Sequence, residues 1–213
     1  GKVFSQNDDF SFSVYYRVNE EASLSGNGFF LWSFATTENT TATAGKYSAY
    51  RLNAQRFASS NGGYQNETGM EMGTASDKGR WIHVAYTEKG GKGVLYIDGK
   101  AVKTKTGMHK NSTNFGSIAI NHCWLGRAPF TADKYLTQTL ITDFRYYGGC
   151  LTAEEIAELA KETEILEYEM INGDGGNNAS LLKTISEAEQ LLTATADYPV
   201  GAVVQLQDAI IIA

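Results

Sequence analysis

Two acidic residues, Glu67 and Glu71, stand close together in the stretch NETGMEMG and have the residue type of a catalytic carboxylate pair. Cleavage of a glycosidic bond with retention of configuration needs two carboxyl groups about 5–5.5 Å apart, which alternate residues on one strand face can supply. Glu67 and Glu71 are four positions apart, so on a strand they would share a face at a separation of about 13 Å. We therefore expect solvated loop carboxylates and no catalytic pair.

The other reactive side chains also lack a catalytic spacing. His83 has no second histidine or cysteine at the spacing of zinc ligands, so it is expected to be a hydrogen-bonded residue of a sheet. Cys123 and Cys150 form no disulfide framework in a chain of 213 residues, and we expect two free cysteines packed as small hydrophobic groups. A mutual disulfide is the alternative. The sequence thus names no catalytic residue and favours a non-enzymatic function.

Charge divides the chain into two parts. Residues 1–151 carry 16 Lys and Arg against 12 Asp and Glu, whereas residues 152–213 carry 2 against 12, which together give the net charge of −6. This acidity and the lack of a basic stripe argue against binding of nucleic acid. No apolar run is long enough to span a membrane, and no signal peptide is present. The chain begins at GKVFSQND and stops within LQDAIIIA, so we expect a piece of a longer protein with any export signal outside it.

Apolar residues alternate with period two through much of the chain, which predicts a series of short strands. The hairpin RWIHVAYTEKGGKGVLYIDGK is the clearest case, with turns at Gly90-Gly91 and Asp98-Gly99, where positive φ is tolerated. About nine or ten strands, with short turns and no intervening helices, predict an all-β sandwich or barrel. Strands are expected within residues 10–18, 28–36, 46–60, 80–100, 117–127 and 138–148, and mainly loop within 61–79.

The periodicity changes to that of a helix after residue 151. Thr152 and Glu155 form a capping box, which predicts a closing helix at about 152–162. Residues 172–180 have the composition of a linker, and residues 181–213 keep the apolar spacing of a helical hairpin. The predicted organisation is a β domain over 1–171, the linker, and the hairpin.

Three motifs, in the same order along the chain, resemble those of concanavalin A-like, laminin-G-like domains: RWIHVAYTEKGGKGVLYIDGKAV, WLGRAPF and ITDFRYYGGCLTAEEIAEL. The likeness covers residues 3–162 and implies a mainly β fold, a two-sheet antiparallel jelly-roll sandwich followed by a short C-terminal helical segment. In such a fold Trp81 and Tyr96 are expected to be core anchors, with the Trp81 indole held between the two layers. Residues 181–213 resemble the FIVAR-type helical segments found beside catalytic domains of bacterial cell-surface glycosidases.

The resemblance has consequences for catalysis and for metal binding. Glucanases of this fold carry the motif E-x-D-x-x-E on one strand, and the sequence does not contain it. Members of the fold often hold a structural calcium ion, which needs six to eight oxygen ligands. Asp143 and Asp9 are the candidate ligands here, but Thr142 stands where the family often has a further acidic residue. Calcium is therefore the one cofactor that the resemblance leaves open.

Sugar recognition uses flat aromatic rings flanked by planar polar groups. Two clusters in the sequence combine these groups, one in NHCWLGRAPFTADKY and one spread over KYSAYRLNAQRF and GGYQNE. The alternative for each residue is packing in the core or at a sheet edge. The candidate binding residues are Trp124, Arg127, Phe130 and Tyr135 in the first cluster and Tyr47, Tyr50, Arg51, Arg56, Tyr64 and Gln65 in the second.

Together these features predict a non-catalytic carbohydrate-binding or accessory module of a larger polysaccharide-degrading glycoside hydrolase. The expected partners are a polysaccharide or glycan and neighbouring domains of the same polypeptide. The expected location is extracellular, at the cell surface or in the periplasm. A spacer or protein-interaction domain without a glycan ligand is the first alternative, and a catalytic glucanase is a less favoured one.

Overall fold

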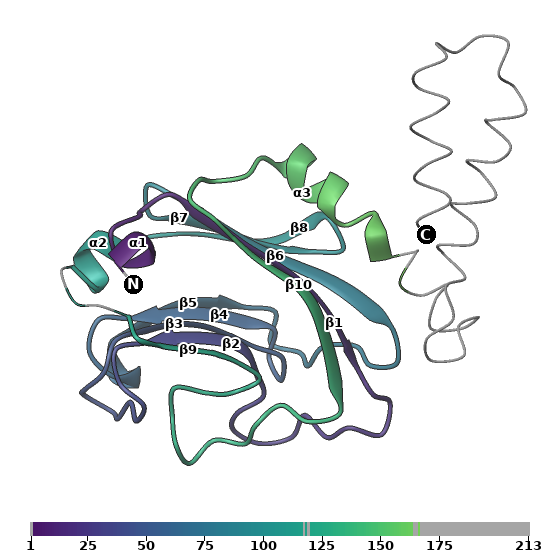
Figure 1. Cartoon of the computed structure of the whole chain (residues 1–213), viewed down its shortest axis with the longest axis horizontal. Helices are drawn as coiled ribbons and strands as arrows, with labels where there is room; N and C mark the ends of the chain where they lie inside the picture. Colours follow the sequence, from purple (N-terminus) through teal and green to yellow (C-terminus); the bar gives the residue numbers. More distant parts are fainter. Residues whose placement is uncertain (1, 117, 119, 164–165, 167–213) are drawn as a thin grey trace, which may run out of the picture. The chain divides into compact units, whose positions relative to one another are not determined.

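The computed structural model describes residues 2–116, 118, 120–163 and 166. The predicted linker and helical hairpin, residues 172–213, lie outside this part of the chain. Within it, the chain forms two five-stranded sheets that pack face to face (Figure 1). The prediction of a mainly β, two-sheet antiparallel sandwich followed by a short helix is therefore confirmed.

Ten strands make up the two sheets, and every strand pair is antiparallel. The first sheet contains β1 (Phe10–Val18), β6 (Trp81–Lys89), β7 (Lys92–Ile97), β8 (Lys100–Thr106) and β10 (Thr139–Tyr147). The second contains β2 (Phe30–Ala35), β3 (Tyr47–Arg51), β4 (Arg56–Ser60), β5 (Glu67–Glu71) and β9 (His122–Leu125). Their orders are β10-β1-β6-β7-β8 and β5-β4-β3-β2-β9. The helical elements are α1 (Lys2–Ser5), the 3-10 helix η1 (Tyr64–Asn66), α2 (Asn111–Asn114) and α3 (Ala153–Leu159).

The core lies between the sheets and is built from alternate residues of their strands. On β1 these are Phe10, Phe12 and further apolar side chains, each at most 1 % exposed. They face the second sheet, where the rings of Trp32 and Tyr50 stack with centroids 4.9 Å apart. Phe12 contacts Trp32 at 5.5 Å and so joins the two layers. The period-two pattern therefore places the largest rings of both sheets in one apolar interior.

The prediction of which face of the central hairpin meets the core was wrong. Ile82 and Tyr86 of β6 point into the interior, so Trp81 and Tyr96 lie on the outer face of the first sheet. Both are buried there at 6 % exposure, and Tyr96 packs against Ile156 of α3. β6 is apolar on both faces because the helix covers the outer one. Alternation alone therefore cannot tell which face of β6 meets the second sheet.

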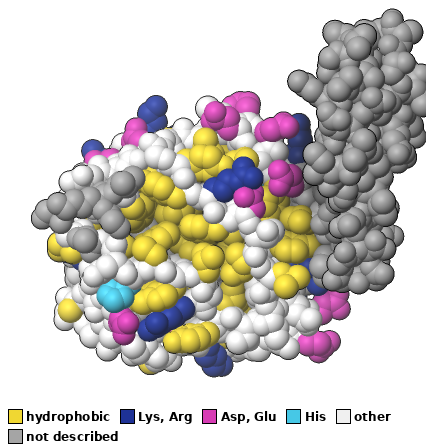
Figure 2. Space-filling view, viewed as in Figure 1, with side chains coloured by type: hydrophobic (Ala, Val, Ile, Leu, Met, Phe, Trp, Pro, Cys, Tyr) yellow, Lys and Arg dark blue, Asp and Glu magenta, His cyan; other side chains and the backbone are white. Residues whose placement is uncertain are grey.

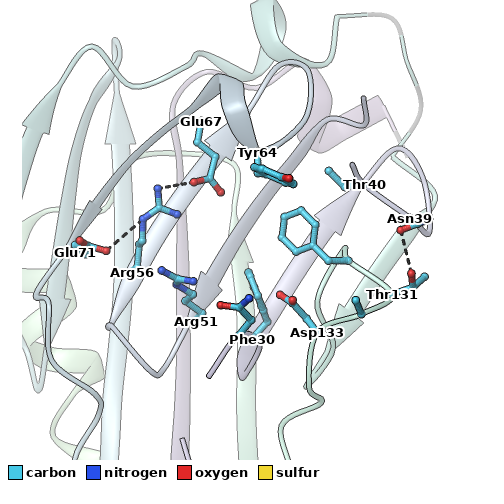
Figure 3. A pocket seen from close by; sticks show the side chains of 13 residues that line it. Phe30, Asn39, Thr40, Arg51, Arg56, Tyr64, Glu67, Glu71, Thr131 and Asp133 are labelled. Carbon is cyan, nitrogen blue, oxygen red and sulfur yellow. Dashed lines mark hydrogen bonds and ion pairs between the residues drawn. The ribbon is translucent and has the colours of Figure 1, made fainter. Parts of the chain in front are cut away.

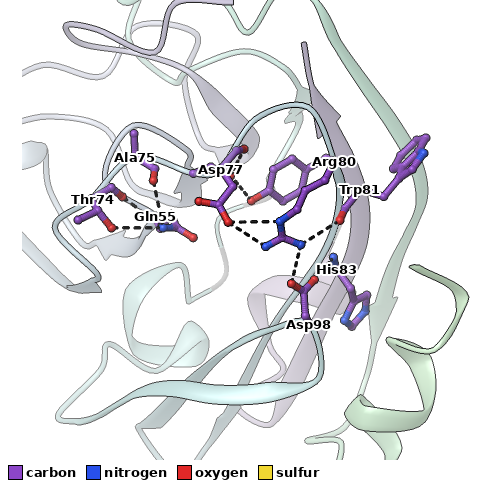
Figure 4. A network of polar contacts seen from close by, with 10 residues as sticks. Gln55, Thr74, Ala75, Asp77, Arg80, Trp81, His83 and Asp98 are labelled. Atoms are coloured by element: carbon purple, nitrogen blue, oxygen red, sulfur yellow. Dashed lines mark hydrogen bonds and ion pairs between the residues drawn. The ribbon is translucent and has the colours of Figure 1, made fainter. Parts of the chain in front are cut away.

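His83 lies on the same outer face and is a hydrogen-bonded sheet residue, as predicted. Its Nε2 is 2.8 Å from the hydroxyl oxygen of Ser13, and its backbone N–H donates to Asp98 at 3.0 Å. Arg80 in turn donates to Asp98 at 2.8 Å and to Asp77 (Figure 4). Burial lowers the pKa of His83 to about 4, although the Asp98 carboxylate acts in the opposite direction.

Residues 61–79, predicted as mainly loop, contain η1 and the edge strand β5. This strand pairs with β4 over its whole length, from Glu67 opposite Ser60 to Glu71 opposite Arg56. It is hard to find in the sequence because Gly69 stands at its centre and only Met70 is buried. The helix α2 and the 3-10 helix η1 also depart from the prediction of no helices between the strands.

The closing helix confirms the capping-box prediction. The Thr152 hydroxyl accepts from the backbone of Glu155, and the Glu155 carboxylate accepts from the backbone of Thr152. Cys123 and Cys150 are free, as predicted, but Cys123 is exposed and not packed as a core residue. Among the described residues, no helix has the length and apolar character needed to cross a membrane.

One edge of the sandwich exposes apolar side chains, because β9 and β10 end the two sheets on the same side. Figure 2 shows these side chains over the middle of the edge. Phe34 and Phe144 from the core are only partly buried, and Leu125 and Leu140 are each 50 % exposed. The strand β9 is also shorter than the predicted stretch 117–127, so it covers little of the interior.

Candidate functional site

A pocket of about 640 Å³ lies on the outer face of the second sheet, the face turned away from the first sheet (Figure 3). This volume is in the range of small-ligand sites. Side chains of β2 to β5 and η1 form one part of the pocket, and residues 130–133 form another. Residues 126–138 between β9 and β10 are called the cover loop below. The lining residues are Asn27, Phe30, Asn39, Thr40, Arg51, Arg56, Tyr64, Glu67, Glu71, Phe130, Thr131, Ala132 and Asp133.

Strand register places four of the lining side chains in one row across the sheet. Phe30 of β2 is opposite Arg51 of β3, Arg51 is opposite Arg56 of β4, and Arg56 is opposite Glu71 of β5. The neighbouring row on the same face consists of small residues, which are Ser33, Ala49, Ala58 and Gly69. Their small size leaves room for larger side chains of the pocket to lie over the sheet.

Arg56 links the two glutamates of β5. Its guanidinium is 2.5 Å from a Glu67 oxygen and 3.4 Å from a Glu71 oxygen. Tyr47 donates its hydroxyl to Glu67 as well, and burial followed by the Glu67 charge raises the pKa of Tyr47, so this phenol stays protonated. The prediction of loop carboxylates was wrong, because both glutamates lie on β5 and are ion-paired, although Glu71 is solvent-exposed as predicted. A guanidinium bound to both carboxylates also disfavours their use as an acid and a nucleophile.

Arg51 and Asp133 are the other charged groups of the pocket. Arg51 makes no ion pair or side-chain hydrogen bond with the part of the chain that the structure describes, and its Nε is buried without a partner. Burial raises the pKa of Asp133, while the positive charge of Arg51 acts to lower it. The pocket therefore holds one ion-paired arginine, Arg56, and one arginine, Arg51, that forms no ion pair with the described residues.

Phe130 is the centre of an aromatic group beside these charges. Its ring centroid is 5.3 Å from that of Tyr47, 6.0 Å from that of Phe30 and 6.2 Å from that of Tyr64. Tyr64 is 52 % exposed, and Figure 3 shows it among the side chains of the pocket. The pocket thus combines an accessible aromatic surface with charged and amide groups, which is the combination that sugar rings need.

The structure brings together residues from both predicted clusters. Arg51 and Tyr64 of the second cluster and Phe130 of the first line the same pocket, with Tyr47 bonded to its Glu67. Tyr50 is fully buried against Trp32 in the interior, so it cannot meet a ligand at this surface. Tyr47 and Tyr50 are three positions apart on β3, and this odd spacing puts them on opposite faces.

The remaining candidates lie elsewhere. Arg127 stacks over Trp124, with its guanidinium carbon 4.4 Å from the ring centroid, and lies 5.8 Å from the ring of Tyr135. These three residues form an aromatic–arginine stack that is not part of the pocket lining. Gln65 is exposed on η1 and does not line the pocket either.

Several lining residues were missing from the sequence prediction. Phe30, Glu67, Glu71 and Asp133 carry no motif, and they meet only through strand register and the path of the cover loop. Arg56, a candidate of the second cluster, does line the pocket, and the short connection between β3 and β4 pairs it with Arg51. The sequence does not show that connection, because Leu52 to Gln55 lack a strong turn motif.

Asp9 and Asp143 do not assemble a calcium site among the described residues. Asp143 is bound to Arg145 at 2.6 Å, and Asp9 accepts the backbone N–H of Gly90 at 3.0 Å in a different part of the first sheet. The described chain contains no group of three or more His, Cys, Asp or Glu residues that could hold a metal ion. These two carboxylates therefore do not fit an ion that needs six to eight oxygen ligands.

Gly28 contacts the cover loop at Lys134. Substitution of Gly28 therefore tests whether this contact holds the loop on the sheet. Gly28 has φ +115° and pairs with Lys134, and the backbone on either side of it bonds to Lys134 at 3.0 and 3.2 Å. A Cβ at this position would lie 2.3 Å from the Lys134 carbonyl oxygen. We expect Gly28→Ala to lower the free energy of unfolding by about 2 kcal/mol and to weaken ligand binding, because the loop must move. Urea unfolding and calorimetric titration measure the two effects.

Gly73→Ala is the matched control for this substitution. Gly73 also has a positive φ, +77°, but nothing lies within 4 Å of a Cβ built there. It should lose about 1 kcal/mol from the backbone conformation alone and keep full ligand binding. Equal effects of the two variants on binding would show that the cover loop does not depend on this close contact.

Comparisons with known proteins agree with this architecture. The family model of the concanavalin A-like lectin/glucanases superfamily named Laminin_G_3 matches residues 2–157. Domain 4 of AbnA, a GH43 extracellular arabinanase from Geobacillus stearothermophilus solved with arabinotriose, is similar with a TM-score of 0.56 and 17% identity, over 73% of this chain and 68% of that chain. The Ruminococcus gnavus IT-sialidase CBM40 bound to alpha2,3 sialyllactose is similar with a TM-score of 0.51 and 12% identity, over 73% of this chain and 84% of that chain.

None of the curated proteins matches the chain in sequence. At 12–17% identity the two structural likenesses show the fold alone. The family model, in contrast, spans well over half of the chain and covers both sheets. The protein therefore belongs to the concanavalin A-like lectin/glucanases superfamily, as a laminin-G-like domain.

Proposed function

We propose that this protein is a non-catalytic carbohydrate-binding module that holds a glycan in the pocket on the outer face of the second sheet. The observation that carries the proposal is the composition of the pocket. Tyr64 and Phe130 provide aromatic surface for the apolar face of a sugar ring. Arg51, Asp133 and Asn39 provide donors and acceptors for its hydroxyl groups within the same 640 Å³.

The structural neighbours support an accessory role. One is a domain of an extracellular arabinanase solved with arabinotriose, and the other is a CBM40 of a sialidase bound to sialyllactose. By analogy, this module would work beside a catalytic domain of the same polypeptide, in an extracellular, cell-surface or periplasmic glycoside hydrolase. A FIVAR-like helical segment at residues 181–213 would then connect it to the rest of that enzyme. Hydrolysis by the module itself is disfavoured by Arg56, which binds both Glu67 and Glu71.

Substitution of Tyr64 tests the location of the site. A glycan array first identifies a ligand, and titration calorimetry then measures its affinity for the wild type and for Tyr64→Ala. We expect the variant to bind about tenfold more weakly, because it loses the exposed ring at the pocket. The melting temperature should stay within a few degrees, since Tyr64 is 52 % exposed and contributes little to the core.

Tyr135→Ala is the matched control, because Tyr135 is 54 % exposed but lies outside the pocket lining. Its affinity should equal that of the wild type within a factor of two. A loss of binding in Tyr135→Ala together with full binding in Tyr64→Ala would move the site to the stack of Trp124, Arg127 and Tyr135. Absence of binding to any glycan on the array would favour a spacer or protein-interaction domain instead.

A further inference from the structure

The two arginines of the pocket have very different surroundings. Arg56 forms ion pairs with two carboxylates, those of Glu67 and Glu71. Arg51 is opposite Arg56 in the strand register, yet it forms no ion pair with the described residues, and its buried Nε has no partner. A buried N–H donor without a partner is unfavourable, and the rest of the Arg51 side chain is only partly buried at the pocket. Arg51 can therefore pair with a group that the chain itself does not supply.

Arg51 is positioned to meet a ligand. It is one of the lining residues, and Figure 3 shows its guanidinium between the Arg56–Glu71 pair and Asp133. The planar fork of a guanidinium matches the two oxygens of a carboxylate, and this charge-assisted pairing is about twice as strong as a neutral hydrogen bond. A hydroxyl group offers a single oxygen and no charge, so it would satisfy Arg51 less well.

On the basis of the proposed function, we propose that the pocket is specific for an acidic saccharide, whose carboxylate pairs with Arg51 while its ring lies against Tyr64 and Phe130. The other charged groups of the pocket restrict the negative charge that this ligand can carry. The pocket contains two arginines and three carboxylates, those of Glu67, Glu71 and Asp133. A densely charged polyanion would be repelled by this excess of negative charge, whereas a sugar unit with one carboxylate can place that group on Arg51 and offer hydroxyl donors to Asp133.

Matched pairs of oligosaccharides test the proposal by calorimetry at low salt. One pair is a xylotriose that carries a single glucuronic acid and the unsubstituted xylotriose, and the other is sialyllactose and lactose. We expect at least one acidic member to bind about tenfold or more tightly than its neutral partner. Addition of 0.5 M NaCl should weaken the acidic ligand only. The pair that shows the preference identifies the source of the carboxylate, a uronic or a sialic acid.

Arg51→Gln removes the charge and retains a shorter polar side chain. It should lower the affinity for the preferred acidic saccharide by about tenfold or more and change the affinity for the neutral partner by less than threefold. Lys103→Gln, which removes an exposed charge on β8 in the other sheet, is the control and should leave both affinities unchanged. Unfolding curves show whether each variant keeps its stability.

Two results would overturn the proposal. The first leaves the proposed glycan-binding function intact, and the second refutes that function as well. Equal affinity for acidic and neutral partners, with an equal effect of Arg51→Gln on both, would refute the acidic specificity and leave a neutral glycan as the ligand. A failure of every saccharide to bind the wild type would refute the acidic specificity and the proposed function together. A salt-sensitive loss confined to the acidic ligand in Arg51→Gln would support the assignment.

Discussion

Replacement of Trp32 by alanine is expected to lower the free energy of unfolding by about 3–5 kcal/mol, as large aromatic deletions in close-packed cores do. Trp32 is fully buried on β2, where it stacks on Tyr50 and contacts Phe12 and Phe144. Its loss would leave a cavity between the two sheets that these rings cannot fill without moving. Urea unfolding followed by far-ultraviolet circular dichroism measures the change.

Trp32→Phe is the control, because it keeps an aromatic ring in the same place. The indole Nε1 is buried with no hydrogen-bond partner among the described residues, so its removal relieves an unsatisfied donor. We expect this variant to lose less than about 1.5 kcal/mol. If Trp32→Phe loses as much free energy of unfolding as Trp32→Ala, the indole itself is required, through a polar or a shape-specific contact.

Glu88→Gln is expected to stabilise the protein by an amount that grows with pH to about 3 kcal/mol. Glu88 is 1 % exposed, and burial raises its pKa to about 7, with Asp8 and Asp9 adding to the shift. Between pH 4.5 and 7 the unfolded chain releases this proton while the folded chain retains it. The folded state therefore binds more protons, and its stability falls as pH rises through this window. Glutamine cannot ionise, so the variant avoids the loss.

Unfolding free energies of the wild type and Glu88→Gln at pH 4.5, 5.5, 6.5 and 7.5 test this prediction. The difference between the two proteins should be small at pH 4.5 and largest at pH 7.5. The Tyr86 hydroxyl donates to Glu88 at 2.6 Å, and the amide oxygen of glutamine can accept this bond. A difference that does not change with pH would mean that Glu88 titrates near its ordinary pKa.

His83 acts in the opposite direction over nearly the same range. Its pKa in the folded protein is lowered to about 4, so below pH 6.5 the unfolded chain gains a proton that the folded chain does not take up until about pH 4. Its contribution to stability is present above pH 6.5 and is lost as pH falls. The two groups offset each other in the wild type, and Glu88→Gln should therefore leave a protein that acid destabilises more clearly.

Much of the fold could be predicted because its strands alternate strongly and its turns have clear signals. The two-residue turns at Gly90-Gly91 and Asp98-Gly99 have positive φ at all four residues, as glycine and aspartate in those places suggest. The facing of the hairpin could not be predicted, because β6 is apolar on both faces. Trp81 has the size of a core residue but belongs to the side that α3 covers.

The site was less predictable than the fold. Phe130, Tyr64 and Arg51 were found because sugar recognition uses aromatic rings beside planar polar groups, and the two stretches that contain these residues combine both. Asp133 and Glu71 could not be found, because nothing local in the sequence links them to the pocket. Their proximity results from strand register and from a loop contact between Gly28 and Lys134, and both are long-range features.

The attachment of the cover loop through main-chain atoms has a consequence for how the module can diversify. Gly28 and Lys134 meet backbone to backbone, and the Thr40 N–H donates to the Pro129 carbonyl at 2.8 Å. Peptide groups are common to all residue types, so these attachments do not depend on the identities of residues 130–133. Exchange of those four side chains could then generate relatives with new sugar preferences on an unchanged frame, which makes this segment a natural choice for a randomised binder library.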